Sequence, residues 1–198
     1  MTNLTVSVIL GSVRPGRMGV RAGAYVQTQL EALGVKVHLI DPVALDVPLF
    51  GTRFDYIPEA DRSPALLELH AKFTESDAVL IVTPEYNHTF SPVISSLLNY
   101  FYHNEFYYKV AGITSYTMGP YGGVRAAIQL RPYLGELGLV SIPKILPLPT
   151  IHALLGEDGS VQHDAVGADA LEAISSGYFK ELLWYAGVHK TARAAGTP

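Results

Sequence analysis

The chain has 198 residues, of which 16% are charged and 48% hydrophobic, and its net charge is -4. This composition excludes global disorder and, without a basic stripe, argues against a nucleic-acid-binding protein. The absence of cysteine excludes disulfides, thiolate metal sites and cysteine nucleophiles, and it fits the reducing cytoplasm. The N-terminal stretch from Met1 lacks the pattern of a signal peptide, and no apolar run of about 18 residues predicts a membrane span.

The first half of the chain alternates apolar runs with amphipathic segments. Residues 4–10 form a β-branched run that predicts a buried strand, and residues 35–40 and 78–83 predict two more. A helix is expected over residues 17–33, and its buried face is predicted to comprise Val20, Ala24, Gln27 and Leu30–Leu33. After a long connection at 41–62, Ser63-Pro64 predicts a helix start, with Ser as N-cap and Pro in the first turn.

The second half continues the alternation. Ser91-Pro92 predicts another helix, which we expect to bury Ile94, Leu97, Leu98 and Phe101. Further strands are predicted at 110–114 and 140–146, the latter at an edge because it contains Pro143. Helices are expected from Gly122-Gly123 to about residue 137 and over residues 164–187. We therefore expect a single domain over residues 1–190 and a flexible C-terminal tail over residues 191–198.

Five strands alternating with five helices predict an α/β protein with three layers, a five-stranded parallel sheet between helices. Right-handed crossovers favour the flavodoxin-like strand order 2-1-3-4-5. In such a sheet, ligands bind at the carboxyl ends of the strands where the strand order reverses, which here lies between strands 1 and 3. The loops after strands 1, 3 and 4 are therefore the places to look for function.

The first of these loops, residues 11–19, leads into a helix N-terminus, where free N–H groups and the helix dipole favour an anion. Ser12, Arg14 and Arg17 add hydroxyl and guanidinium donors, so the loop predicts a phosphate site. It has the glycine spacing of a P-loop, but Arg17 and Met18 replace the Lys and the Ser or Thr, which argues against nucleotide triphosphate hydrolysis. The alternative is a glycine-containing turn with two solvated arginines.

The loops after strands 3 and 4 have residues suited to a flat ligand. Residues 83–90 combine a proline at the strand exit with Tyr86 and Asn87, although a plain Pro-Asn turn explains these residues as well. Residues 114–123 combine small residues, which let a ligand approach the backbone, with aromatic residues that can stack on it. The alternative for this last loop is a flexible surface loop.

Taken together, the three loops resemble those of the NADPH-dependent FMN reductase family, a flavodoxin-like group that includes azoreductases and quinone or chromate reductases. The resemblance runs from about residue 4 to 146, and three segments carry it: Gly11-Ser12-x-Arg14-x-Gly16-Arg17, Thr83-Pro84-Glu85-Tyr86-Asn87, and Ser115 through Gly122-Gly123-Val124-Arg125-Ala126. The stretch from Gln129 to Gly138 also looks like the family. The sequence departs from the family at Leu98, where relatives have a lysine between Leu and Asn.

The resemblance implies a bound FMN, with NADPH or NADH as reductant and a small molecule as electron acceptor. Three groups of residues would hold the cofactor: Ser12, Arg14, Gly16, Arg17, Met18 and Gly19 at the phosphate; Pro84, Glu85, Tyr86 and Asn87 beside the isoalloxazine; and Ser115, Tyr116, Tyr121, Gly122 and Gly123 on the other side of the cleft. Because the flavin carries the chemistry, no catalytic side chain is assigned. Glu85 is interpreted as a proton relay, as a solvated carboxylate or as the cap of a nearby helix. The seven histidines lack metal-ligand spacing, so no metal is expected.

An aromatic run follows the second loop, with six Tyr or Phe residues over residues 100–108. It is interpreted either as packing inside the monomer or as a subunit contact that also walls the cleft, and we expect a homodimer or homotetramer. The sequence favours an FMN-dependent NAD(P)H oxidoreductase that reduces flavin, quinone, azo or related acceptors. The alternatives are a flavodoxin-type electron carrier and a protein that keeps the fold without the flavin.

Overall fold

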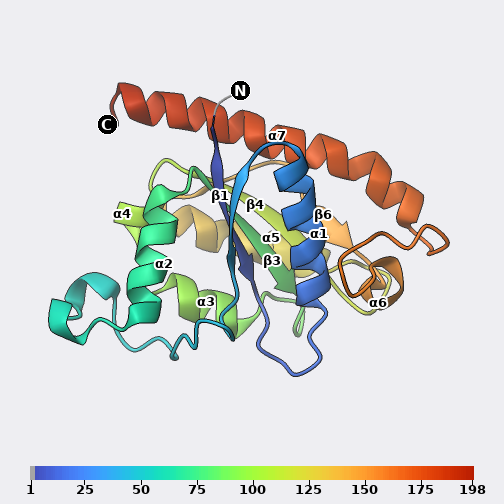
Figure 1. Ribbon diagram of the computed structural model, residues 1–198, viewed down its shortest axis with the longest axis horizontal. Coiled ribbons are helices and arrows are strands. Elements are labelled where there is room, and N and C mark those ends of the chain that lie inside the picture. The colour runs from blue at the N-terminus through green and yellow to red at the C-terminus, as the bar shows by residue number, and fades with distance from the viewer. Residues whose placement is uncertain (1–2) are drawn as a thin grey trace.

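The computed structural model describes residues 3–198. Met1 and Thr2, the first residues of the N-terminal stretch that lacks a signal-peptide pattern, lie outside the described residues. A parallel sheet with the order β2-β1-β3-β4-β5 forms the centre, and a short β6 also pairs with β4 (Figure 1). This order confirms the predicted flavodoxin-like fold. The strands are β1 (Thr5–Leu10), β2 (Lys36–Ile40), β3 (Ala78–Pro84), β4 (Val110–Tyr116), β5 (Val140–Ser141) and β6 (Leu146–Leu148).

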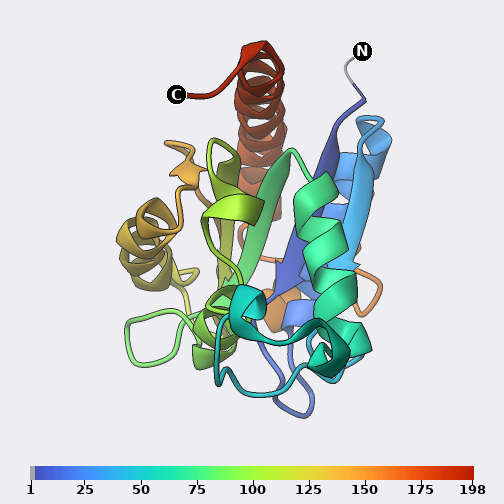
Figure 2. The same cartoon turned by 90° about the vertical axis from the view of Figure 1, so that its left-hand side faces the viewer.

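Helices cover both faces of the sheet. Buried side chains of α1 and α7 form one apolar core with one face of the strands, and α2, α3, α4 and α5 supply a second core on the opposite face. Figure 2 shows α2 in front of the strands and α7 behind them. The helices are α1 (Gly19–Ala32), α2 (Pro64–Glu75), α3 (Pro92–Leu98), α4 (His103–Phe106), α5 (Val124–Glu136), α6 (Ile151–Leu154) and α7 (Ala168–Ala195), with 3-10 turns η1 (Phe54–Tyr56) and η2 (Glu59–Asp61) between β2 and α2.

The strand and cap predictions agree well with the structure. Every residue of β1, β3 and β4 is buried, as expected for apolar strands covered on both faces. The Ser63 hydroxyl accepts a hydrogen bond from the Leu66 N–H at 3.3 Å, which makes it the N-cap of α2. Ser91 also precedes a helix, but its hydroxyl donates instead to the Gly11 carbonyl at 2.5 Å. It thereby ties the start of α3 to the loop after β1.

The predicted face of the first helix is only partly correct, because Leu30 is buried and its other large apolar members are not. Val20 and Leu33, both assigned to that face, are 41% and 42% exposed. The helix instead turns small residues toward the sheet, and its buried positions are Gly19, Ala22, Gly23, Tyr25, Val26 and Leu30. A Cβ atom at Gly23 would collide with the Leu10 side chain, so close approach of α1 to β1 selects small residues over large apolar ones.

Two predicted elements are broken in the structure. The strand expected at 140–146 divides into β5 and β6, because Pro143 has no N–H to donate to β4. The Arg131 guanidinium donates to the carbonyls of Ile142 and Pro143 at 2.9 and 2.7 Å, which satisfies these carbonyls where the strand is interrupted. The helix expected to reach Phe101 ends at Leu98, and the chain then forms the separate short α4.

The aromatic run after α3 divides between the interior and the surface. Tyr100, Phe101 and Phe106 are at most 4% exposed, whereas Tyr107 and Tyr108 are 39% and 37% exposed. The Phe106 ring meets Phe73 of α2 edge-on, with centroids 5.2 Å apart. The interpretation as packing inside the monomer therefore holds for about half of the run.

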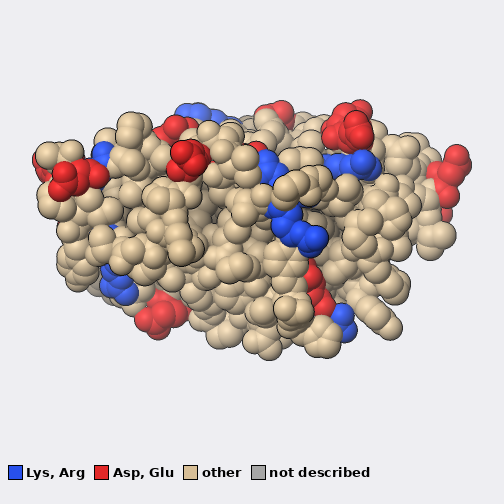
Figure 3. All heavy atoms as spheres, turned by 90° about the horizontal axis from the view of Figure 1, so that it is seen from below, with Lys and Arg blue, Asp and Glu red and all other residues tan. Residues whose placement is uncertain are grey.

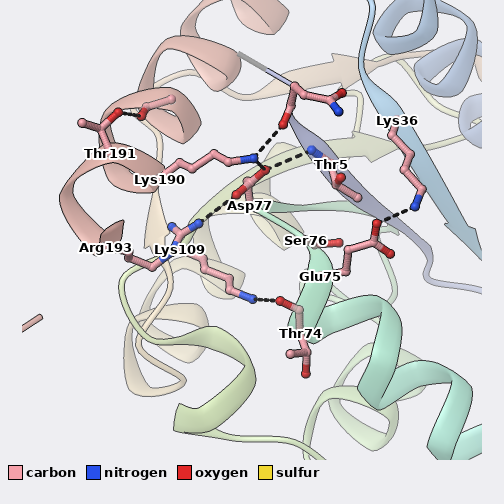
Figure 4. Close-up of polar contacts among 12 residues, drawn as sticks. Thr5, Lys36, Thr74, Glu75, Ser76, Asp77, Lys109, Lys190, Thr191 and Arg193 are labelled. Atoms are coloured by element: carbon pink, nitrogen blue, oxygen red, sulfur yellow. Dashed lines mark hydrogen bonds and ion pairs between the residues drawn. The ribbon is translucent and has the colours of Figure 1, made fainter. Parts of the chain in front are cut away.

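The C-terminal helix is tied to the amino ends of the strands (Figure 4). Asp77, at the start of β3, is 7% exposed and accepts hydrogen bonds from the Thr5 N–H, the Lys190 ammonium and the Arg193 guanidinium at 3.1, 2.9 and 3.0 Å. The predicted tail boundary at Thr191 falls inside α7, because these contacts continue the helix to Ala195. None of the helices described is long and apolar enough to cross a membrane.

Candidate functional site

A cleft of about 410 Å³ opens at the carboxyl edge of the sheet, where the strand order reverses. Its volume lies within the usual range for small-molecule sites. The lining comes from the loops after β1, β3 and β4 and from the start of α6: Ser12, Arg14, Pro15, Gly16, Arg17, Met18, Pro84, Glu85, Tyr86, Tyr116, Thr117, Met118 and Ile151. The molecule is seen from this side in Figure 3, where few charged side chains stand among mostly uncharged ones.

The first wall of the cleft is the loop between β1 and α1. No side chain caps the N-terminus of α1, so its first N–H groups and its dipole are available to an anion. Gly16 has a φ of 68°, a conformation in which glycine is favoured. The Arg14 side chain is exposed and forms no ion pair with any residue from 3 to 198. Its guanidinium carbon lies 5.7 Å from the centroid of the Tyr86 ring.

Arg17 is held inside the protein rather than solvated. Its guanidinium donates to the Asp41 carboxylate at 2.5 Å and to the Ser12 carbonyl at 2.9 Å, and its side chain is only 13% exposed. Asp41 directly follows β2 and was not recognised in the sequence as part of the site. Arg17 therefore braces the loop between β1 and α1 against the end of β2, and it also lines the cleft.

Hydroxyl groups form the floor of the cleft. The Ser12 hydroxyl, which is almost fully buried, shares a hydrogen bond of 2.9 Å with the Tyr86 hydroxyl. Tyr116 at the end of β4 lies beside them, and burial raises the pKa of its phenol well above the ordinary value. The phenol of Tyr116 thus stays protonated at neutral pH and can donate a hydrogen bond.

The second wall is a tight two-residue turn. The backbone N–H groups of Tyr86 and Thr89 each donate to the carbonyl of the other, at 2.9 and 3.0 Å. Asn87 and His88 at the tip have φ angles of 51° and 65°, as the central residues of a type I′ turn do. Asn tolerates this conformation better than most residues, so one role of Asn87 is to form the turn that presents Tyr86 to the cleft.

Glu85 joins the second wall to the third. Its side chain is only 5% exposed, and Oε1 accepts from Nε and Nη2 of Arg125 at 2.6 Å each. Oε2 accepts from the backbone N–H of Arg125 at 3.2 Å, in the first turn of α5. Of the three interpretations of Glu85, the helix cap is therefore the one that the structure supports, and the low exposure of the side chain contradicts a solvated carboxylate.

The third wall is shaped by two glycines and by buried hydrogen bonds. Gly122 and Gly123 have φ angles of 60° and 77°, and a Cβ on Gly123 would lie 2.9 Å from the Tyr116 backbone nitrogen. The fully buried Ser115 hydroxyl donates to the Gly122 carbonyl at 2.7 Å. The two glycines therefore allow the chain to turn sharply from β4 into α5, and the Ser115–Gly122 hydrogen bond ties the end of the loop to β4.

The cleft brings together nine of the fifteen residues predicted to hold a cofactor. The other six lie around it without lining it: Gly19, Asn87, Ser115, Tyr121, Gly122 and Gly123. Four lining residues were not predicted. Pro15, Thr117 and Met118 lie in loops already singled out, whereas Ile151 comes from a region without a recognisable motif. Hydrogen bonds from the backbone of Thr150 and Ile151 to Gly119 and Thr117 place α6 at the cleft.

These features fit a phosphate-bearing planar cofactor. The uncapped helix start and the exposed Arg14 suit a phosphate, and the aromatic side chains of Tyr86 and Tyr116 on the other walls suit a ring. The sequence matches the family of NADPH-dependent FMN reductases over residues 4–153, most of the chain. The chain belongs to this family. Membership implies FMN as the cofactor and NAD(P)H as the reductant, which agrees with the site.

Three relatives illustrate the range of this FMN reductase family. The chain is 28% identical to an NADPH azoreductase of Bacillus sp. (strain OY1-2), with 94% of each chain covered. It is also 28% identical to the NAD(P)H-dependent FMN reductase LOT6 of Saccharomyces cerevisiae, over 74% of this chain and 85% of the relative. The structure of FerB, a flavoenzyme NAD(P)H:(acceptor) oxidoreductase of Paracoccus denitrificans, superposes with a TM-score of 0.74 at 25% identity, over 92% and 98% of the chains.

A metal centre finds no support within residues 3–198. No group of three or more His, Asp or Glu residues in this range is placed to hold an ion.

Proposed function

We propose that this FMN reductase binds FMN in the cleft at the carboxyl edge of the sheet and passes electrons from NAD(P)H to a small acceptor. The phosphate would be held by the loop at residues 12–17 and the start of α1. The ring would lie between residues 84–87 and 116–123. The observation that carries this proposal is the uncapped α1 N-terminus opening into a cleft with hydroxyl and aromatic walls.

FMN, when bound, supplies the ring that accepts hydride and passes electrons on. The chain itself binds and orients the cofactor. The hydroxyl groups of Ser12 and Tyr86 line the cleft; one donates to the other, which leaves one O–H of the pair to donate to a ligand, and the protonated phenol of Tyr116 adds a second donor. Loops shaped by Gly123 and by the 86–89 turn border the space for the ring.

The acceptors we propose are flavin, quinone, azo or related compounds. NAD(P)H and the acceptor would use the same open space over the ring in turn, which is a ping-pong mechanism. Names of relatives support two of these acceptor classes, an azo compound and FMN. The cytoplasm is the proposed location, since a chain without cysteine fits a reducing compartment.

The test begins with the absorption spectrum of the purified protein, before and after addition of FMN. Flavin absorbance that co-purifies or binds stoichiometrically supports the site, and oxidation of NADPH or NADH with a quinone or an azo dye supports turnover. Initial rates at several concentrations of both substrates should give parallel double-reciprocal lines. A protein that stays colourless with FMN contradicts the proposal. A yellow protein that oxidises neither nucleotide with any of these acceptors is an electron carrier instead.

We also propose that the chain forms a homodimer or homotetramer. Three exposed apolar side chains support this: Val13, Val43 and Leu49 are 47%, 51% and 84% exposed, and they belong to loops near the phosphate-binding end of the molecule. Exposed apolar surface of this kind is typical of subunit contacts. Multi-angle light scattering at micromolar concentration should give at least twice the mass of 21.5 kDa, and the mass of a single chain would contradict the proposal.

A further inference from the structure

The pair formed by Glu85 and Arg125 is built more rigidly than a surface ion pair. Both oxygens of the carboxylate are engaged, one by two guanidinium nitrogens and the other by a backbone N–H. The carboxylate is 5% exposed and the guanidinium 43%, so the negative end of the pair is buried and the positive end reaches the surface. The pair therefore fixes a buried charge and its counterion in one geometry.

The pair also connects two walls of the cleft. Glu85 follows β3 and lines the cleft, while Arg125 lies in the first turn of α5, next to the glycines of the third wall. The Arg125 guanidinium carbon lies 5.3 Å from the centroid of the exposed Tyr121 ring, so the loop before α5 is included in the same assembly. A substitution in this pair therefore alters the contacts of both walls.

The effect of this arrangement on a bound ligand depends on how far the positive charge of Arg125 compensates the negative charge of Glu85. A lone carboxylate lining the cleft would oppose any negative charge added there, because its burial reduces screening by water. Arg125 compensates the carboxylate, and Glu85 lies at the N-terminal end of α5, where the helix dipole contributes partial positive charge. The pair with the helix end is thus neutral to slightly positive.

We propose that the Glu85–Arg125 pair sets the reduction potential of bound FMN, with Arg125 as a positioning residue that keeps the Glu85 carboxylate compensated beside the ring. This inference rests on the proposed binding of FMN in the cleft. Electrons added to the ring raise its negative charge. The net charge of Glu85 and Arg125 beside the ring therefore affects how tightly reduced FMN binds relative to oxidised FMN, and this ratio of affinities sets the shift in reduction potential.

The test measures the two-electron midpoint potential of the FMN-loaded protein by equilibration with reference dyes at about pH 8, well above the ordinary pKa of a glutamate. Arg125→Gln leaves the carboxylate without its counterion and should lower the potential. Glu85→Gln leaves the guanidinium and should raise it. Arg125→Lys keeps the charge and should restore most of the wild-type value, and the double variant Glu85→Gln/Arg125→Gln should lie between the single ones.

The expected change in each single variant is about tenfold or more in the ratio of the dissociation constants of oxidised and reduced FMN. For a two-electron couple, tenfold corresponds to about 30 mV. Shifts of opposite sign support the inference, because a loss of packing alone would move both variants in the same direction. Shifts of the same sign, or none, overturn it. Failure of the wild-type protein to bind FMN would instead refute the proposed function.

Discussion

The variant Arg14→Ala tests whether the loop between β1 and α1 binds the phosphate, without disturbing the structure of that loop. The Arg14 side chain is exposed and has no ion-pair partner from Asn3 to Pro198, so its removal breaks no ion pair of the fold. Under the proposed mode of FMN binding, it removes one charge-assisted hydrogen bond to the phosphate. Such a bond contributes about 1.5–3 kcal/mol, which corresponds to a loss of about 10- to 150-fold in affinity.

The assay is a fluorescence titration of the apoprotein with FMN and, in parallel, with riboflavin, which has the same ring and no phosphate. Arg14→Ala should lower the affinity for FMN and leave the affinity for riboflavin unchanged. Lys180→Ala removes an exposed positive charge from a different part of the surface, on α7, and should change neither affinity. An unchanged FMN affinity, or an equal loss for riboflavin, would refute the assignment of the phosphate to this loop.

Further predictions concern stability. Phe106→Ala should lower the free energy of unfolding by about 3–5 kcal/mol in denaturant titrations, because the fully buried ring packs on Phe73; a loss below about 1 kcal/mol would contradict the assignment of this ring to the core. Burial, together with the charge of Arg193, lowers the pKa of Lys109 from 10.5 to about 8. Between these pH values the unfolded lysine binds more protons than the folded one. The free energy of unfolding of the wild type should therefore rise with pH by up to about 3 kcal/mol relative to that of Lys109→Met. Parallel pH dependences of the two free energies of unfolding would contradict a lowered pKa of Lys109. His88→Gly should stabilise by about 0.5–1 kcal/mol in thermal melts, since glycine relieves the left-handed conformation, and a lower melting temperature would count against a strained turn.

The sheet was predictable because its strands are continuous apolar runs between turn residues. The run at 78–83 and the Ser63-Pro64 start needed no tertiary information, since buried parallel strands and N-caps are local patterns. The face of α1 was not predictable, because Gly23 is buried through a close approach to Leu10 that only the packed structure defines. Apolarity favoured Val20, which points to solvent.

In the candidate site, too, the features set by local sequence were predictable and those set by tertiary contacts were not. Its location and most of its lining follow from strand order and from three unusual loops. Pairings between distant residues do not, because the sequence specifies which groups carry charge and not which of them meet. Asp41 bonds Arg17 from 24 positions away, and Arg125 bonds Glu85 from 40 positions away. The second pair favours a helix cap at Glu85, where the sequence left a relay, a solvated carboxylate and a cap open.

The anchoring of α7 by Asp77 has a practical consequence for handling the protein. Lys190 also donates to the Asn3 carbonyl, so the start of β1 and the last turns of α7 meet at the amino edge of the sheet, on the side away from the cleft (Figure 1). A linker or an electrode attachment near Asn3 or the last turn of α7 therefore leaves the cleft facing the solution.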